Sequence, residues 1–488
     1  MKKNIYFLTG SQHLYGVDIL AQVAKNSDTI VEFLNSQKHN PVTIIASPPL
    51  TTSQEITMAI KKANADENCV GVITWMHTFS PSKMWIEGFS ILAKPYLHLH
   101  TQANEKLPFD SIDMDFMNLN QAAHGDREHG FIAARMRLRR KVIVGFYKDL
   151  DTVTEIFDWA RAAIAYNFSR NLKVARFGDN MREVAVTEGD KVEAQIKFGW
   201  QVDGYAVGDL VEYINKVTKK ELDTAYENLQ KDYIINTDKI DSVKEQLKYQ
   251  LAMRKFFDDN QIGAFTNTFQ DLHGLKQLPG LATQNLMAQG FGYGGEGDWK
   301  TAALGAVMQK MAESKKGATG FMEDYTYDLT KGNELVLGAH MLEVPPSFAA
   351  SKPKVEVHAL GIGGKEPPAR LVFDGITGEG IVVSLIDLGN RFRMIVAEVE
   401  LVKQPKPMPK LPVARIMYKL KPNFKTGAAA WILAGGAHHT VASTALTTVD
   451  MRSLATMFGI ECVVIDKNTH IDELEKSLLY SDIVYGVK

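Results

Sequence analysis

Short apolar segments alternate with amphipathic ones over the first hundred residues. Four of the apolar segments have the length of buried strands: residues 4–8, 42–46, 70–75 and 96–100. Residues 19–34 and 55–64 carry the apolar spacing of helices. This order of strands and helices predicts a parallel sheet covered by helices on both faces. Ligands bind such sheets at the carboxyl ends of the strands, where this chain places polar clusters such as Ser11-Gln12-His13.

The same alternation continues through the middle of the chain. The helical segments predicted there are 111–139, 208–217, 221–230 and 242–257, and the strands are 141–146 and 173–176. A further helix is predicted to begin at Asp298 or Trp299 and to stop at Gly317, because aspartate caps helices and glycine ends them. We therefore predict a second α/β domain that starts near residue 170.

The pattern changes after about residue 320, where short β-rich segments follow one another between glycine, proline and asparagine turns. These segments are 335–344, 354–360, 370–374, 380–387 and 391–403. Their spacing is typical of a barrel or a sandwich. A helix near 448–458, a strand at 461–465 and a helix near 471–480 close the chain. We predict three domains: an α/β domain over 1–170, a second over 171–320, and a β-rich domain with a closing α/β segment over 321–488.

Composition and charge exclude several classes of protein. The 488 residues are 45% hydrophobic and 23% charged, which is typical of globular domains and not of disordered or fibrous chains. The net charge is −2, so the basic excess of proteins that bind nucleic acid through its phosphates is absent. A basic cluster between Arg135 and Lys141 ends a predicted helix, where cations offset exposed carbonyl groups, and this explanation is favoured over polyanion binding.

The cysteines and the N-terminus indicate a cellular compartment. Cys69 and Cys462 lie in apolar runs and are too few for a disulfide framework, so buried free thiols in a reducing compartment are expected. Only four apolar or aromatic residues follow the first polar ones, fewer than a signal peptide needs. No apolar run approaches the roughly 18 residues that cross a bilayer. We expect a cytoplasmic protein without a membrane or nucleic-acid partner.

The segment 290–299 is the strongest local anomaly in the sequence. Five of the eight residues from Gly290 to Gly297 are glycine, which lets the backbone approach a ligand closely or adopt positive φ. Glu296 lies just before a predicted helix N-terminus, where the helix dipole favours an ionised carboxylate. The plainer interpretation is a flexible turn with Asp298 as the helix cap.

Three further sites carry candidate metal ligands. Glu323 belongs to an acidic pair that enters a strand-like stretch, and alone it would be a solvated edge residue. His340 follows an apolar strand, where a lone histidine is usually a satisfied core residue. His438 and His439 stand behind a Gly-Gly turn at a predicted strand end, and packing explains them poorly because one must face each way.

Taken together, Glu296, Glu323 and two of these imidazoles suit a divalent ion such as Mn²⁺, which accepts both oxygen and nitrogen. Zinc is disfavoured because no cysteine and no HExxH spacing accompany them. Other chemistries lack their signatures: the first strand is not followed by GxGxxG, residues 361–365 do not form a P-loop, and GxSxG is absent. Without tertiary assembly, the spacing alone does not establish the site.

Longer motifs resemble a known family. The motifs are residues 10–16, 77–81, 111–120, 176–182, 271–277, 295–300, 321–327 and 434–440. They resemble those of the L-arabinose isomerase family, and the resemblance covers nearly the whole chain. It implies two Rossmann-like (flavodoxin-like) parallel-sheet domains followed by a C-terminal β-barrel-containing domain. It also implies an aldose–ketose isomerase that converts L-arabinose to L-ribulose, the first step of arabinose catabolism, with D-galactose to D-tagatose as a side activity.

The resemblance also assigns residues and partners. It implies one Mn²⁺ per subunit and a homohexamer, and the chemistry needs no organic cofactor. Because the implied sugar contacts and metal ligands lie in different domains, we expect active sites shared between subunits. Carried over by position, the metal ligands are Glu296, Glu323, His340 and His439. The sugar contacts are Gln12, Leu14, Phe79, His124, Met181 and Phe269. Asp298, Glu343 and His438 are expected to be polar groups behind the ligands.

The chemistry of the implied reaction fits these residues. Glu296 and Glu323 would move the proton between C1 and C2 through an enediol. Two other hypotheses stay open from the residues alone. One is a sugar-binding module or transcriptional regulator built from tandem α/β domains, and the other is a metal-dependent isomerase for a different sugar, such as fucose. Release of ketose from a panel of aldoses distinguishes the three.

Overall fold

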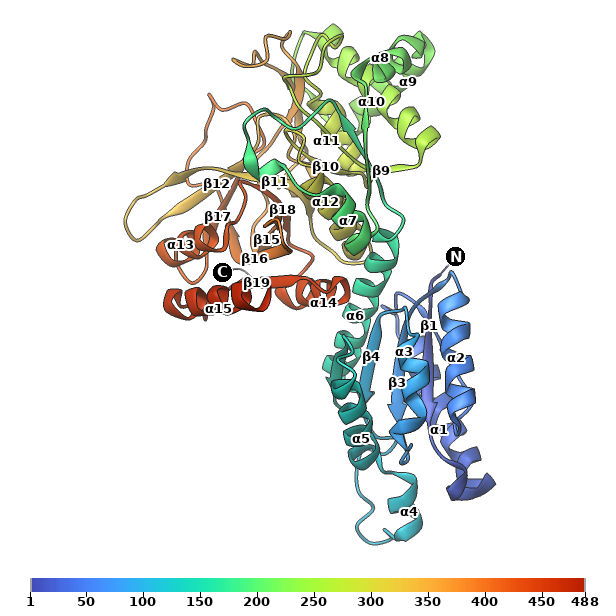
Figure 1. Ribbon diagram of the computed structural model, residues 1–488. Helices are drawn as coiled ribbons and strands as arrows, with labels where there is room; N and C mark the ends of the chain where they lie inside the picture. The colour runs from blue at the N-terminus through green and yellow to red at the C-terminus, as the bar shows by residue number, and fades with distance from the viewer. Residues whose placement is uncertain (1, 487–488) are drawn as a thin grey trace. The chain divides into compact units, whose positions relative to one another are not determined.

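The computed structural model describes residues 2–486 and divides them into two compact units (Figure 1). One unit holds the chain up to Asn167 together with Thr456–Gly459. The other unit holds the remaining residues. Each unit is described by itself below.

The first unit is built on a five-stranded parallel sheet of order β2-β1-β3-β4-β5. Its strands are β1 Asn4–Gly10, β2 Thr43–Ala46, β3 Cys69–Met76, β4 Tyr96–His100 and β5 Lys141–Val144. Its helices are α1 Gly16–Ser36, α2 Ser53–Ala65, α3 Ile86–Ser90, α4 Met114–Leu119, α5 Ala122–Arg135 and α6 Leu150–Ser169. The predicted α/β layer is confirmed.

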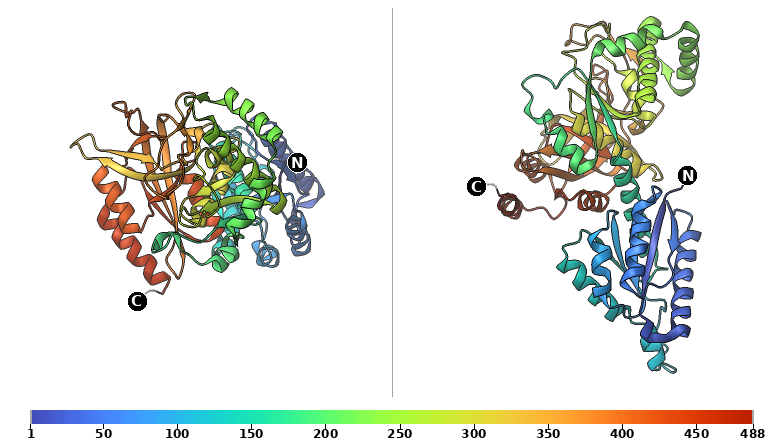
Figure 2. Two further views of the ribbon diagram at one scale, coloured as in Figure 1. Left: turned by 90° about the horizontal axis from the view of Figure 1, so that it is seen from above. Right: turned by 45° about the vertical axis from the view of Figure 1, so that its right-hand side comes forward.

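Both faces of this sheet are buried, as the continuous apolar strands require. On β1, Ile5 and Phe7 pack with α1 and α6, while Tyr6 and Leu8 pack with α2, α3 and α5 on the other face. Helices flank the sheet on both sides in the right-hand view of Figure 2. Helix α2 starts with a capping box in which Thr52 and Glu55 satisfy each other's backbone N–H groups.

The stretch predicted as helical over 111–139 holds two helices, α4 and α5. Asp113 caps α4 by accepting from the N–H of Phe116, and Asn120 leaves the helical region at φ −107° and ψ 66°. Helix α5 then begins at Ala122 and ends at Arg135, and Arg137 has a positive φ of 56°. The helix-like sequence pattern of 111–139 therefore covers more residues than the two helices themselves.

The second unit begins with a parallel sheet of order β10-β9-β6-β7. Its strands are β6 Lys173–Phe177, β7 Gln201–Tyr205, β9 Ile262–Asn267 and β10 Gly292–Gly294. Its helices are α7 Lys191–Phe198, α8 Val207–Lys216, α9 Lys219–Asp232, α10 Ile240–Asn260, α11 Leu281–Ala288 and α12 Trp299–Ala312. Helices α8, α9 and α10, drawn in green, lie together at one end of this unit (Figures 1 and 2). The predicted second α/β layer is confirmed.

A closed β-barrel follows, as predicted for the C-terminal domain. Six strands pair in the ring order β15-β18-β11-β12-β17-β16, and β15 closes the ring by pairing with β16. These strands are β11 Thr319–Asp328, β12 Leu335–Ala339, β15 Gly378–Asp387, β16 Phe392–Val402, β17 Ile416–Leu420 and β18 His439–Ser443. Side chains such as Met322, Val336, Ile395 and Tyr418 belong to its buried core. Closure removes exposed sheet edges among these strands.

The remaining elements are one strand, three helices near the C-terminus and the short 3-10 helices of both units. Strand β19 Glu461–Ile465 pairs in parallel with β16. The helices of this region are α13 Phe424–Ala434, α14 Thr448–Phe458 and α15 Ile471–Val484. Four short 3-10 helices lie at His13–Tyr15, Ser82–Trp85, Ala185–Thr187 and Pro346–Phe348.

Two predicted strands of the β-rich region do not belong to the barrel. β13 Lys354–Val357 and β14 Ala369–Val372 form a separate three-stranded sheet with β8 Ile234–Ile235. The strand predicted over 335–344 also ends earlier, at Ala339. Local apolar patterns show that a segment is extended but not which sheet it joins, since the partner β8 lies far away in the sequence.

Candidate metal centre

Three of the four predicted metal ligands are brought together by strand pairing in the barrel. Glu323 lies in β11, where it pairs with Ala339 of β12 on one side and with His439 of β18 on the other. His340 directly follows Ala339. The register of three strands therefore places one carboxylate between two imidazoles that are far apart in the sequence.

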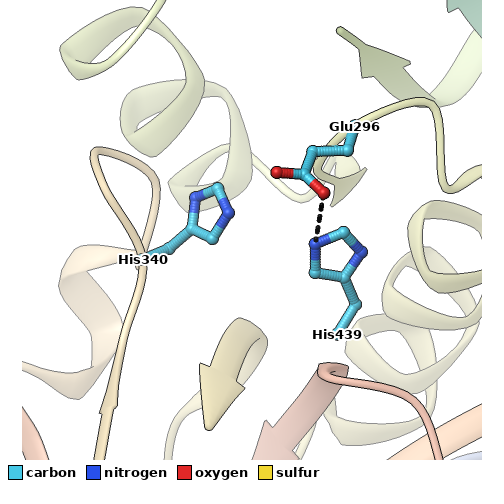
Figure 3. A group of neighbouring side chains, drawn as sticks. All are labelled: Glu296, His340 and His439. Atoms are coloured by element: carbon cyan, nitrogen blue, oxygen red, sulfur yellow. Dashed lines mark ion pairs between the residues drawn. The ribbon is translucent and has the colours of Figure 1, made fainter. Parts of the chain in front are cut away.

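Glu296 comes from the turn between β10 and α12. The glycines around it permit close approach: a Cβ on Gly295 would lie 3.3 Å from Nε2 of His340 and 3.4 Å from Nε2 of His439. Glu296 itself has a positive φ of 59°, which is uncommon for a residue with a side chain and is typical of functional sites. The turn thus presents the Glu296 carboxylate to both histidines (Figure 3).

The donor atoms surround a common point without bonding to one another. Nε2 of His439 lies 3.8 Å from Oε2 of Glu296, and Nε2 of His340 lies 3.7 Å from Oε2 of Glu323. One donor atom each from Glu296, His340 and His439 lies within 4.8 Å of the other two. Donors held at about 2.1 Å by an octahedral ion lie about 3 to 4.2 Å apart. The separations of 3.7 and 3.8 Å fall in that range, whereas the 4.8 Å limit of the group extends slightly beyond it.

The surroundings of His439 decide that these residues fit a divalent ion. Its side chain is 0% exposed, and Nε2 has no hydrogen-bond partner among residues 2–486. A buried nitrogen lone pair without a partner is costly in a folded protein, and a metal ion would satisfy it. Two carboxylates and two imidazoles without a thiolate suit Mn²⁺.

Carboxylates behind the histidines fix the orientation of both rings. Nδ1 of His340 lies 2.5 Å from Oε2 of Glu343, and Nδ1 of His439 lies 3.2 Å from Oδ2 of Asp298. In each case Nδ1–H donates to the carboxylate, which leaves the Nε2 lone pair directed at the common point. Asp298 also caps α12 by accepting from the N–H of Thr301, as the sequence predicted.

The charges of the site shift its titrating groups. The nearby imidazoles, that of His438 first, outweigh burial and lower the pKa of Glu296, and the Glu296 carboxylate in turn raises the pKa of His438. Burial would lower the pKa of His340, but the carboxylates of Glu343, Glu323 and Glu296 outweigh it and raise that pKa. An acidic cluster that attracts protons in this way also attracts a cation.

Three sequence-family models match consecutive parts of the chain. They describe the L-arabinose isomerase N-terminal domain over residues 1–171, the central domain over 173–314 and the C-terminal domain over 318–461. This chain belongs to the L-arabinose isomerase family. The resemblance found in the sequence motifs is therefore confirmed.

Relatives with this family name match over almost their whole length. The L-arabinose isomerase of Geobacillus stearothermophilus is 55% identical over 98% of this chain and 98% of its own length. That of Anoxybacillus flavithermus is 55% identical over 99% and 97%, and the L-arabinose isomerase 1 of Clostridium acetobutylicum is 52% identical over 97% and 98%. A solved periplasmic sugar-binding protein from Legionella pneumophila matches 63% of this chain and 93% of its own at 11% identity and a TM-score of 0.13, which carries no argument.

The sugar contacts implied by the L-arabinose isomerase family are divided between the two units. Met181 and Phe269 belong to the second unit with the four ligands. The N–H of Met181 donates to the carbonyl oxygen of Glu296 over 2.9 Å. Phe269 lines a small cavity of about 30 Å³ together with Glu296 and His340. These two residues therefore lie beside the candidate ligands.

The other four implied contacts lie in the first unit, at the carboxyl ends of β1 and β3 or close to them. Gln12 and Leu14 follow β1, and Leu14 is 83% exposed. Phe79 follows β3 and stacks on His124 of α5 with 4.6 Å between ring centroids. The loops that carry Gln12 and Phe79 are tied by a 2.7 Å hydrogen bond between Ser11 and Thr78.

The two histidines of the pair differ in exposure, and the strand predicted before them is wrong. His439 is fully buried, whereas the His438 side chain is 38% exposed and its Nε2 lies 3.8 Å from Oε2 of Glu296. The residues before them are not a strand, because α13 runs to Ala434 and ends at Gly435 with a φ of 82°. His439 therefore begins β18, and His438 lies in the short connection between α13 and that strand.

Two residues close to the centre in the sequence carry features that the sequence did not indicate. Asp324 accepts a hydrogen bond from Tyr418 in the barrel, and burial, together with the charge of Glu323, raises the pKa of Asp324 to about 6. Alternation along a strand places Asp324 on the face opposite to Glu323, toward Tyr418 of the barrel core. Lys300, in the first turn of α12, is fully buried beside Asp298.

The remaining sequence expectations concern thiols and membranes. Both cysteines are free; Cys69 is buried, but Cys462 is only partly so, and burial raises the pKa of each thiol. Among residues 2–486, every helix is too short or too polar to span a bilayer.

Proposed function

We propose that this chain is a metal-dependent aldose–ketose isomerase that converts L-arabinose to L-ribulose, with D-galactose to D-tagatose as a side activity. Membership of the L-arabinose isomerase family supports the reaction, because relatives of that name match the full chain at 52% to 55% identity. The buried, unpartnered Nε2 of His439, in a group with Glu296 and His340, supports the metal dependence, and Glu323 lies 3.7 Å from Nε2 of His340.

The proposed ligands are Glu296, Glu323, His340 and His439, with one Mn²⁺ per subunit and no organic cofactor. When bound, the ion supplies a Lewis acid that polarises the sugar oxygens and stabilises negative charge that develops on them. Glu343 and Asp298 hold the two imidazoles with Nε2 free for this ion.

Proton transfer is assigned to the carboxylates. Moving the carbonyl from C1 to C2 requires removal of the C2 proton and delivery of a proton to C1, through an enediol. Glu296 and Glu323 come from different elements, the β10–α12 turn and β11, so they can approach the reacting carbons from two directions. The lowered pKa of Glu296 keeps it ionised and able to accept a proton near neutral pH.

The apolar contacts exclude water from the intermediate. Met181 and Phe269 lie beside the ligands, whereas Leu14 and Phe79 lie on the first unit. Leu14 and its neighbour Val17 are each 83% exposed, so they exclude water only when another surface covers them. We propose that a neighbouring copy of this chain covers them, in a homohexamer whose active sites are shared between subunits.

The test is a ketose assay on chelator-treated, dialysed enzyme, before and after addition of Mn²⁺. L-Arabinose should yield ketose only after Mn²⁺ is restored, and D-galactose should yield it more slowly. Turnover without metal would contradict the metal dependence. Sugar binding without any ketose from a panel of aldoses would favour the binding-module hypothesis instead.

A further inference from the structure

Lys300 is a buried cation that the proposed reaction does not use. It is the second residue of α12, and its side chain is 0% exposed. A lysine is almost never fully buried unless its charge and its donors are satisfied. Its Nζ donates to the carbonyl oxygens of Thr187 over 2.9 Å and of Glu188 over 2.6 Å. These two bonds fix the position of the ammonium group.

The ammonium group forms its ion pair with Asp298. Nζ of Lys300 lies 3.5 Å from Oδ1 of Asp298, which is itself only 1% exposed. Oδ1 also accepts from the N–H of Thr301, while Oδ2 accepts from the Thr301 hydroxyl over 2.7 Å and faces Nδ1 of His439 at 3.2 Å. The two carboxylate oxygens are thus divided, one toward the cation and one toward the imidazole.

The segment that anchors Lys300 is held against the turn that carries Glu296. The Asn180 side chain donates to the carbonyl oxygens of Thr187 and Gly297, over 2.7 and 3.2 Å. The approach is so close that a Cβ on Gly297 would lie 2.4 Å from Cα of Asn180. The Thr187 carbonyl that holds Lys300 is therefore tied through Asn180 to the turn that carries Glu296.

We infer that Lys300 is a positioning residue for the metal centre: it holds the Asp298 carboxylate in the orientation that fixes the His439 ring with Nε2 toward the ion. The inference rests on the proposed function, because it requires that His439 is a metal ligand. Groups behind metal ligands commonly contribute 10- to 100-fold to metal affinity, through the orientation and basicity of the ligand. Lys300 stands one step further out and acts through Asp298.

The test measures Mn²⁺ affinity by electron paramagnetic resonance, in which free Mn²⁺ gives the signal. Lys300→Gln keeps a donor for the carbonyl oxygens but removes the charge, whereas Lys300→Met removes both. Each should weaken Mn²⁺ binding by about tenfold or more. Lys300→Gln is the deciding variant if Lys300→Met does not fold. The matched control is Lys365→Met, because Lys365 also donates to two carbonyl oxygens, of Leu272 and Leu275, and should bind Mn²⁺ like the wild type.

A double-mutant cycle with Asp298→Asn shows whether the effect passes through that carboxylate. Since Lys300 acts through Asp298, Lys300→Gln should cost much less Mn²⁺ affinity in the Asp298→Asn background than in the wild type. A merely structural role for Lys300 would make the two costs additive. Additive costs, or wild-type affinity in Lys300→Gln, overturn the inference. A wild-type protein that binds no Mn²⁺ would instead overturn the proposed metal dependence.

Discussion

Replacing Glu343 by glutamine should weaken metal binding without changing any proposed ligand. Glu343 is 7% exposed, and its carboxylate accepts from Nδ1 of His340, the N–H of Leu342 and the Tyr293 hydroxyl, over 2.5, 3.0 and 3.4 Å. The amide oxygen of glutamine can keep the first two donors, and the hydroxyl can rotate to accept from the new NH₂ group. The hydrogen bond of His340 then becomes neutral, and neutral bonds are roughly half as strong as charge-assisted ones.

We expect a loss of roughly tenfold in Mn²⁺ affinity, which corresponds to about 1.4 kcal/mol. The assay is a Mn²⁺ titration followed by electron paramagnetic resonance, with thermal unfolding as a check on the fold. Glu356→Gln is the matched control, because Glu356 accepts from Nε2 of His358 over 2.8 Å in the separate sheet of β13. The reasoning is refuted if Glu343→Gln binds Mn²⁺ within about twofold of the wild type, or if the control weakens binding equally.

Three further predictions address catalysis, assembly and stability. Glu296→Gln and Glu323→Gln should each lower kcat by at least ~10² with metal bound, measured with metal analysis alongside; near-native kcat would exclude that residue as the proton carrier. His124→Ala and Glu323→Ala, unfolded and reassembled together, should recover about a quarter of the sites if sites are shared between subunits, and none if each site belongs to one chain. Hydrogen bonds from Arg393 and other groups outweigh burial and lower the pKa of Glu461. The stabilisation that ionised Glu461 gives the folded protein should therefore be complete above about pH 4.5, its pKa in the unfolded chain. It should be lost as the pH falls through the lower pKa of the folded state. Glu461→Gln should cost about 3 kcal/mol at pH 7 and make acid unfolding less steep; an unchanged acid limb would contradict this.

The sequence predicts the layers of the fold well because strands and helices have different apolar periods. It fails where a segment is short or its partner is distant. Trp431-Ile432-Leu433-Ala434 is an apolar run that fits a strand or a buried helix equally. Signals at both ends favour helix α13 over a strand. Asn423 caps the helix by accepting from the N–H of Thr426, and Gly435 takes the left-handed conformation after it.

The sequence predicts only part of the candidate site. The glycine run around Glu296 and the adjacent histidines are unusual enough to draw notice. Packing arguments alone do not choose between His438 and His439, because that choice depends on the β11–β18 register, which pairs Glu323 with His439. Lys300 left no signal, because a lysine in the first turn of a helix is ordinarily solvated.

The closed barrel has a consequence for the order of folding. The hairpin β15–β16 pairs residues that are close in the sequence, but the β11–β18 pairing joins Glu323 to His439 across most of the C-terminal domain. Pairings between distant segments form slowly, because the intervening chain must lose its entropy before the contact is made. The geometry that unites these two side chains therefore arises only when the ring closes. Uptake of Mn²⁺ during refolding should report that late step, after most of the helical signal has returned.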